Sequence, residues 1–475
     1  MLSRSFCLGL CVFLVALLYN KWKDGLNGLD DQEQTIITFW NSSIKEPDRQ
    51  FKRIVVGTNC NLDLIVSGVD LLQALHEGPG DPQDSVHLAT IDDLVNTFTL
   101  YFVKGSAAER AVTNAKVFKE IIQAAESLQK KHHYIGGNAA LMAVKISELY
   151  PDAQVQLVGP IGPALKDLIP SNIIVPENSL ITEDEVHLIM EYGLNEQWDN
   201  LRSPVANRFI TSYDESNSKL TMLNKFFKNL GPFNPDLVIL SGLHLLEMQT
   251  HAFVSDKLQA VRNGLGGIPR NIPVHLELAS MANKDCVTQI MQMVASEVSS
   301  IGLNEQELTF ASYVGGGPHA SYYNEREGQP EIHKISDMVL WLLKTYGYSK
   351  KNPTSRLTRV HFHSLTYHII GSLPDVWFNS ESAVAAGTRI AGRQACDTKA
   401  LSPEDIELRI PKTFKLFSGS HDIIFDENNP VFSWEKDGFH FVFSPVLVCI
   451  NPSKTVGLGD AISATGLMYS SFKFS

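Results

Sequence analysis

The stretch TVGLGDAISATG, Thr455–Gly466, puts two glycines directly before Asp460 near the carboxyl end of a 475-residue chain. The preceding run SPVLVCI is typical of a strand, NPSKTVGLGD of a loop and AISATGLMYSS of a helix. Gly457 and Gly459 let backbone N–H groups turn toward a ligand, and a helix amino terminus adds the positive end of its dipole. Such a turn suits phosphate oxygens, and a carboxylate there is placed to take a proton from an attacking hydroxyl. The plainer interpretation makes Asp460 only the N-cap of the helix.

The rest of the chain alternates short apolar runs with segments of helical spacing, such as KISDMVLWLLKTYG. This alternation predicts an α/β fold with a mostly parallel central sheet and helices on both faces. Two regions, about 65–130 and 180–225, break the rhythm, and the second contains the alternating runs VHLIMEY and NRFITSY. We expect them to form a smaller, discontinuous α+β lid, with ligand bound between the two lobes.

The composition and net charge limit which classes of function the chain can have. The chain is 44% hydrophobic and 19% charged, as a globular protein with a large core would be. Its 40 basic and 52 acidic residues give a formal net charge of −12, and no long basic run is present. The chain is therefore not expected to bind nucleic acid, and a phosphorylated substrate would need local positive groups.

The amino-terminal segment differs in composition from the rest of the chain. Arg4 precedes an apolar run over 6–19 that Lys21 and Lys23 follow, so residues 1–22 are predicted to be a signal peptide or an uncleaved anchor. Localisation in the endoplasmic reticulum lumen or secretion follows, with membrane contact only if the segment is not cleaved. Residues 23–50 are expected to be a linker, and 51–475 one domain that includes the two lid regions.

Amide and carboxylate side chains cluster after two predicted elements. NCNLDLIVSG puts Asn59, Asn61 and Asp63 after the first strand, with alternate side chains on one side if the chain stays extended. Such groups suit sugar hydroxyls, although an Asx-rich turn would have the same sequence. YIGGNAALMAV opens an apolar helix with Gly136-Gly137-Asn138, which indicates either a close backbone approach to a ligand or a tight packing turn.

Taken in order, NCNLD, GSAAE, IGGNAAL, EVHLIMEY, NRFI, HLELAS, NEQE and TVGLGD resemble the ADP-dependent glucokinase family of the ribokinase-like superfamily. The resemblance runs from about residue 51 to 470, and the signal-like segment is similar to that of the animal branch. It implies a glycolytic kinase that transfers the β-phosphoryl group of ADP to the 6-hydroxyl of glucose and releases AMP, with Mg²⁺, acting as a monomer.

The resemblance also implies roles for individual residues. Asp460 would be the catalytic base, and Gly457, Leu458 and Gly459 the anion-hole loop. Arg208 would reach nucleotide phosphate, and the carboxylates of Glu277 and Glu307, in H-x-E and N-x-x-E motifs, would hold Mg²⁺ largely through water. The implied glucose contacts are Asn61, Asp63, Glu109, Gly136, Gly137, Asn138 and His187.

Other functions stay open from the residues alone. A kinase of the same fold with ATP or another sugar would share the loop chemistry, and a sugar- or nucleotide-sensing pseudokinase is the non-enzymatic alternative. His361 and His363 share one side of a predicted strand without an evident third ligand, so we interpret them as structural or nucleotide-side residues. We also hypothesise a disulfide between Cys396 and Cys449, given the oxidising compartment and the position of Cys449 in the strand before the loop.

Overall fold

The computed structural model describes residues 32–325, 329–453 and 456–474, so the predicted signal segment over 1–22 lies outside the described residues. The chain divides into two compact units, which we call the middle unit (Phe51–Ser299) and the terminal unit (residues up to Gln50 together with Ser300–Ser475). Within the described ranges, the structure contains no helix that is both long and apolar enough to cross a membrane.

The middle unit contains a parallel sheet of buried strands. β1 (Arg53–Gly57) pairs with β12 (Leu237–Leu240) on one side and β6 (Gln154–Val158) on the other, and β13 (Val274–Glu277) and β7 (Ile173–Ile174) follow outward. Continuous apolar strands of this kind require cover on both faces. The expected mostly parallel α/β architecture is confirmed. The helices of this part are α5 (Asn138–Leu149), α6 (Pro163–Leu168), α7 (Leu223–Phe233), α8 (His251–Gly266) and α9 (Lys284–Met293), with the 3₁₀ turns η1 (Glu177–Ser179), η2 (Leu243–Met248) and η3 (Ala295–Glu297).

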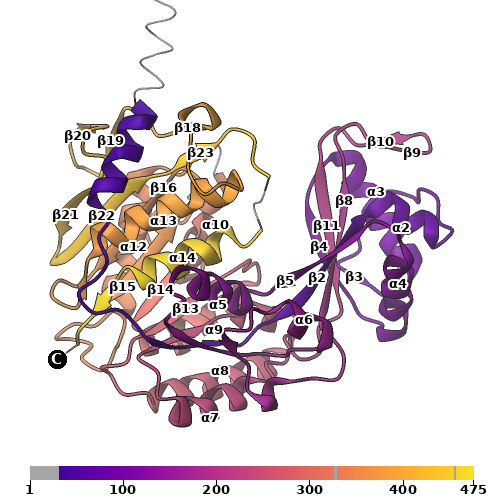
Figure 1. The fold of residues 1–475 in the computed structure, drawn as a ribbon, viewed down its shortest axis with the longest axis horizontal. Helices are drawn as coiled ribbons and strands as arrows, with labels where there is room; N and C mark the ends of the chain where they lie inside the picture. The colour runs from indigo at the N-terminus through magenta and orange to yellow at the C-terminus, as the bar shows by residue number, and fades with distance from the viewer. Residues whose placement is uncertain (1–31, 326–328, 454–455, 475) are drawn as a thin grey trace, which may run out of the picture. The chain divides into compact units, whose positions relative to one another are not determined.

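A second, mixed sheet also belongs to the middle unit, with the strand order β3-β4-β11-β8-β2-β5. Helices α2, α3 and α4 lie along it in Figure 1. Both regions that break the strand–helix rhythm contribute to it, and its first strand starts at Asn61, slightly before the predicted boundary. The elements are β2 (Asn61–Ser67), α2 (Gly68–Ala74), β3 (His87–Leu88), α3 (Ile91–Lys104), β4 (Ala108–Val112), α4 (Ala115–Ser127), β5 (Lys131–Gly136), β8 (Val186–Tyr192), β11 (Asn207–Ser212) and the separate hairpin β9 (Gln197–Trp198) with β10 (Leu201–Arg202).

One face of this second sheet packs into a hydrophobic core. Alternate residues of β2, β8 and β11 join an aromatic cluster in which Phe98 and Phe102 of α3 meet Tyr192, Trp198 and Phe209. Thr90 begins α3 with a capping box to Asp93, which fixes where that helix enters the core. Burying one face in this way directs the intervening residues of every strand to the other face.

The terminal unit pairs β14 (Ser300–Leu303) and β15 (Arg359–His363) in parallel, and then β16 (Tyr367–Ser372), β22 (Phe439–Pro445) and β21 (Phe432–Lys436) antiparallel. Helices α13 and α14 pack side by side in this unit (Figure 1). Its helices are α10 (Glu305–Gly315), α11 (Tyr322–Glu325), α12 (Ile332–Tyr346), η4 (Pro403–Asp405), α13 (Ser380–Ala395) and α14 (Leu458–Met468). Short antiparallel pairs complete it: β17 (Trp377–Phe378) with β24 (Ser471–Phe472), β18 (Ile406–Leu408) with β23 (Leu447–Cys449), and β19 (Thr413–Lys415) with β20 (Asp422–Ile424).

The expected linker over 23–50 needs correction, because residues 32–43 are helical. Ile36 and Trp40 of this segment are fully buried, which a solvated linker would not allow. The segment is also held to the terminal unit by hydrogen bonds, since Glu33 accepts from the N–H of Leu408 (2.9 Å) and the N–H of Lys45 donates to Ser382 (3.0 Å). Residues 32–45 are thus a docked part of the terminal unit.

Candidate active site

The polar face of the second sheet gathers most of the predicted substrate residues. Asp63 lies opposite His187 in the β2–β8 register, and His187 lies opposite Ser212 in β8–β11. Residues that are directly opposite, or two apart on one strand, share a face. By this rule the face presents Asn61, Asp63, Glu109, Gly136, His187 and Arg208.

Asn61 and Asp63 form a buried pair at one end of that face. Nδ2 of Asn61 donates to Oδ1 of Asp63 at 2.6 Å, and both side chains are buried. Burial raises the pKa of Asp63, although the nearby His187 and the amide of Asn61 act in the opposite direction. Gly136 lies across the strand pair, where a Cβ would collide with the Asn61 amide and the Asp63 carboxylate. The glycine therefore makes room for the two polar side chains.

Asn138 is the first residue of α5, and it is held by Asn59, which the sequence grouped with Asn61 and Asp63 as a candidate for sugar hydroxyls. Nδ2 of Asn59 donates to Oδ1 of Asn138 at 3.1 Å, while Oδ1 of Asn59 accepts from the hydroxyl of Ser241 (2.7 Å) and the N–H of Ala139 (3.3 Å). Asn59 is buried. Its bonds fix the amide of Asn138 and the start of α5, which follows Gly137.

His187 is paired with a residue that the sequence did not indicate, Asp214. Nε2 of His187 lies 2.7 Å from Oδ2 of Asp214. Burial alone lowers the pKa of His187, but the Asp214 carboxylate, with Asp63 and Glu109, raises it to about 10. The ring is therefore an imidazolium at neutral pH. Only one sequence signal marked Asp214, namely that a carboxylate directly follows the alternating run NRFITSY.

In the terminal unit, the GLGD motif begins helix α14. Gly457 is the N-cap at φ 67° and ψ 17°, a left-handed conformation that favours glycine. Asp460 is buried in the first turn, as the third residue of the helix, so it is not the N-cap itself. The N–H groups of Leu458 and Gly459 precede the first intrahelical bond, which Ala461 donates to the Gly457 carbonyl (3.0 Å). Backbone donors and a carboxylate therefore lie within one helical turn.

The predicted histidine pair lies beneath this turn. His361 and His363 of β15 are buried, and their rings lie within 6.3 Å of the ring of His368 on β16. A Cβ on Gly459 would lie 2.9 Å from Cε1 of His363, so the motif approaches the cluster closely. Burial holds the pKa of His368 well below its usual value, which keeps that ring neutral. No group of three or more metal-ligating side chains suited to a metal ion occurs in the part of the chain that the structure describes.

Two buried carboxylates belong to the predicted metal motifs. In the middle unit, Nε2 of His275 donates to Oε2 of Glu277 at 2.9 Å. In the terminal unit, Asn304 and Glu307 form a capping box at the start of α10, with the Asn304 N–H donating to Oε2 of Glu307 at 2.5 Å. Each carboxylate is thus oriented by a protein donor through one oxygen. Oriented carboxylate oxygens fit the ligand preference of Mg²⁺.

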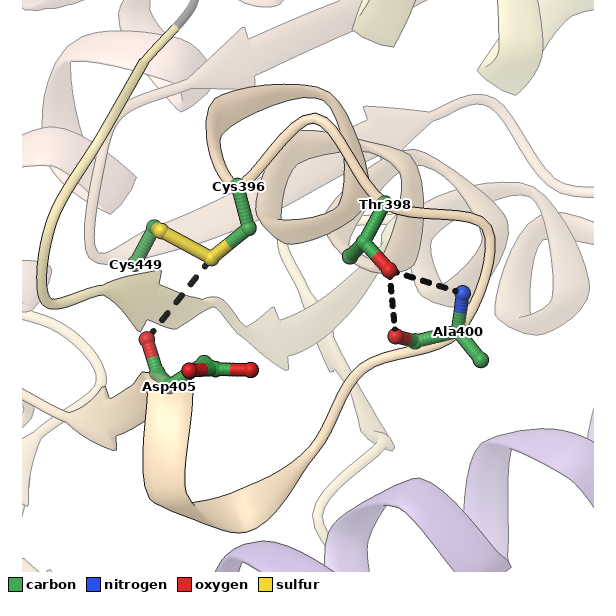
Figure 2. The surroundings of a disulfide bond; sticks show 5 residues. All are labelled: Cys396, Thr398, Ala400, Asp405 and Cys449. Atoms are coloured by element: carbon green, nitrogen blue, oxygen red, sulfur yellow. Dashed lines mark hydrogen bonds between the residues drawn. A yellow bond between two sulfur atoms is a disulfide. The ribbon is translucent and has the colours of Figure 1, made fainter.

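The hypothesis of a disulfide between Cys396 and Cys449 is confirmed (Figure 2). The bond joins the C-cap of α13 to β23, with the Cα atoms 5.5 Å apart, and the Asp405 carbonyl lies 3.6 Å from Sγ of Cys396. Thr398 and Ala400 close the adjoining turn through the threonine hydroxyl. The strand that precedes the GLGD loop is therefore covalently anchored.

The architecture is similar to that of solved structures. A solved ADP-dependent kinase in complex with fructose-6-phosphate and ADPβS aligns with a TM-score of 0.64 at 19% identity, over 93% of this chain and 97% of that one. The structure of the last common ancestor of ADP-dependent phosphofructokinases from Methanosarcinales aligns with a TM-score of 0.65 at 19% identity, over 94% and 98% of the two chains. At such identities these likenesses establish the fold.

Two relatives found by sequence have a higher identity to this chain than these solved structures. An ADP-dependent glucokinase of Bos taurus is 44% identical over 447 residues, or 93% of this chain and 89% of the relative. A probable ADP-dependent glucokinase of Caenorhabditis elegans is 40% identical over 481 residues, or 99% and 95% of the two chains. Residues 52–469 match the ADP-specific Phosphofructokinase/Glucokinase conserved region. The chain therefore belongs to the ADP-specific phosphofructokinase/glucokinase family.

Proposed function

We propose that this protein transfers the β-phosphoryl group of ADP to the 6-hydroxyl of D-glucose, giving glucose 6-phosphate and AMP. The family and the names of the two animal relatives support glucose and ADP as substrates. The observation that carries the chemistry is the first turn of α14, where Asp460 lies beside backbone donors shaped by Gly457.

The proposal divides the work between two sets of residues. The polar face of the second sheet, with Asn138, binds the sugar, and Arg208 adds positive charge for the nucleotide. Asp460 accepts the proton of the 6-hydroxyl of glucose. At the same time the hydroxyl oxygen bonds to the β-phosphorus of ADP, and the bond between the β-phosphorus and the oxygen that leaves with AMP breaks. The N–H groups of Leu458 and Gly459 receive the negative charge that develops on the phosphoryl oxygens.

We further propose that Glu277 and Glu307 hold Mg²⁺ largely through water. The support is their carboxylate chemistry and the protein donors that orient them. When bound, Mg²⁺ would neutralise phosphate charge.

A donor-by-acceptor activity matrix tests the function. ADP and ATP would each be offered with glucose, fructose 6-phosphate and other sugars, in preparations free of adenylate kinase and with or without a chelator. We expect ADP with glucose to be strongly preferred, with AMP accumulating one-for-one with glucose 6-phosphate, and chelation to stop the reaction. A preference for ATP, or for fructose 6-phosphate over glucose, would overturn the donor or the acceptor assignment respectively.

We also propose that the protein acts as a monomer in the endoplasmic reticulum lumen or after secretion. The Cys396–Cys449 disulfide supports an oxidising compartment, where such bonds persist. Light scattering of the purified protein and protease protection of it in isolated microsomes test the two statements. A dimer, or a chain that protease digests without detergent, would contradict them.

A further inference from the structure

The segment that follows β11, residues 214–218, is held in place from two directions. The Glu185 carboxylate accepts the backbone N–H groups of residues 215–217, at 3.2, 2.9 and 3.4 Å. The Asn217 side chain exchanges two bonds with the backbone of Cys60, donating to its carbonyl (2.9 Å) and accepting from its N–H (3.3 Å). The backbone that carries Asp214 is therefore fixed to β8 and to the start of β2.

The side chain of Asp214 is largely covered and is hydrogen-bonded to His187. The Asp214 side chain is 8% exposed, that of His187 is 16% exposed, and Oδ2 accepts from Nε2 at 2.7 Å. Burial raises the pKa of Asp214, but His187 and hydrogen bonds from the side chains of Glu185 and Asn217 together lower it.

Several ionisable groups surround this pair. Asp63 and Glu109 act on His187 from the polar face, Glu185 acts on Asp214, and His244 of η2 is affected by both partners. Burial lowers the pKa of His244 to about 4, so it stays neutral, and burial raises the pKa of Glu185 to about 7. Arg208 is near enough to affect Asp63. Among these groups Asp214 is the carboxylate bonded directly to His187.

We propose that Asp214 is a positioning residue for the sugar: it holds His187 through Nε2, so that the ring presents its other N–H to a hexose hydroxyl as a charged donor. This inference rests on the proposed function, because it assigns the hydroxyl to bound glucose. With Nε2 committed to the carboxylate, Nδ1 is the ring nitrogen left for a ligand. A charged donor binds a hydroxyl more strongly than a neutral one.

The direction in which glucose affinity should depend on pH follows from the His187–Asp214 pair. In the unchanged protein the raised pKa keeps His187 protonated, and protonation is lost only as the pH rises through about 10. His187 should therefore contribute no change in glucose affinity between about pH 6 and 8, and a change of the unchanged protein in that interval would report Glu185, whose pKa is raised to about 7. Asp214→Asn keeps an acceptor for Nε2 but removes the charge, so His187 should lose its proton within or below that interval.

The test compares Asp214→Asn with Glu215→Gln, which removes the adjacent, exposed carboxylate of the Lys219 ion pair. Glucose binding is measured by calorimetry, and kcat and KM are measured from about pH 6 to 8. We expect D214N to raise the Kd and KM for glucose about tenfold at pH 8 and less at pH 6, with kcat changed less than about threefold. E215Q should match the unchanged protein. In a His187→Gln background, D214N should have no further effect.

Nitrogen NMR of the His187 ring in the unchanged protein gives a readout that does not depend on a variant folding. A doubly protonated ring at pH 8 is expected, and a neutral ring would refute the inference. It would also be refuted if D214N bound glucose with normal affinity and a flat pH profile. Absence of glucose binding by the unchanged protein would refute the proposed function together with this inference, which separates the two failures.

Discussion

The amino terminus of α14 and the polar face of the second sheet place functional groups by different means. At α14 the groups are backbone N–H donors and one carboxylate, and their geometry depends on Gly457 at φ 67°. On the sheet the groups are side chains from β2, β4, β8 and β11, spaced by strand register. A site built from backbone should fail abruptly when one residue changes, whereas a site built from registered side chains should lose affinity in steps.

Asp460→Asn should have the largest effect. Removing the proposed base should lower kcat by about two orders of magnitude or more, with KM for glucose and thermal stability little changed. Asp437→Asn, which alters an exposed carboxylate in the terminal unit, is the control. Near-normal turnover of D460N would reject the base assignment, and a stability loss of up to about 1 kcal/mol without a loss of rate would indicate that the carboxylate only stabilises the first turn of α14.

Gly457→Ala should have the next largest effect and tests the backbone half of the comparison. Gly457 and Gly438 both have positive φ, at 67° and 84°, so an alanine at either position should destabilise the fold by about 1 kcal/mol. Of the two glycines, only Gly457 orients the anion-hole N–H groups, those of Leu458 and Gly459, and G457A should therefore lower kcat about tenfold. G438A, in the turn between β21 and β22, should keep normal turnover. Equal activity of the two variants would show that the loop conformation does not matter for catalysis.

Asn59→Ala should have a smaller effect, on the sugar side only. Losing the amide that orients Asn138 should raise KM for glucose by about threefold to tenfold and leave kcat close to normal. Asn172→Ala removes another amide bond to α5, a long one to the Ser147 carbonyl, and should leave KM unchanged. A fall in kcat without a change in KM would instead connect Asn59 to the transfer step.

Sequence analysis predicted those elements of the fold that are marked by a short, contiguous residue pattern. Buried strands such as β12 and β13 are short apolar runs between turn residues, which the sequence shows directly. Most of the substrate residues named from the family resemblance lie on one face of the second sheet because the register of its strands aligns them. Asp214 was missed, and Asn59 was named without its bond to Asn138, because these contacts join segments 27 and 79 positions apart. No periodicity encodes such a contact.

The helix over 32–43 was missed for a different reason. Its polar composition masked Ile36 and Trp40, which are four residues apart as one helical face requires. The short pairs β17–β24, β18–β23 and β19–β20 also escaped prediction, since strands of two or three residues are too short to show an alternating pattern.

That docked helix determines where the chain can be shortened. Removing residues 1–50 would uncover the surface that buries Ile36 and Trp40, at a cost of roughly 3–6 kcal/mol, and would leave Ser382 at the start of α13 without the Lys45 N–H. A chain beginning at residue 32 should be recovered soluble and melt like the longer protein. One beginning at residue 51 should aggregate or melt at a distinctly lower temperature. Comparable yield and melting temperature of the two shortened chains would show that the helix is dispensable.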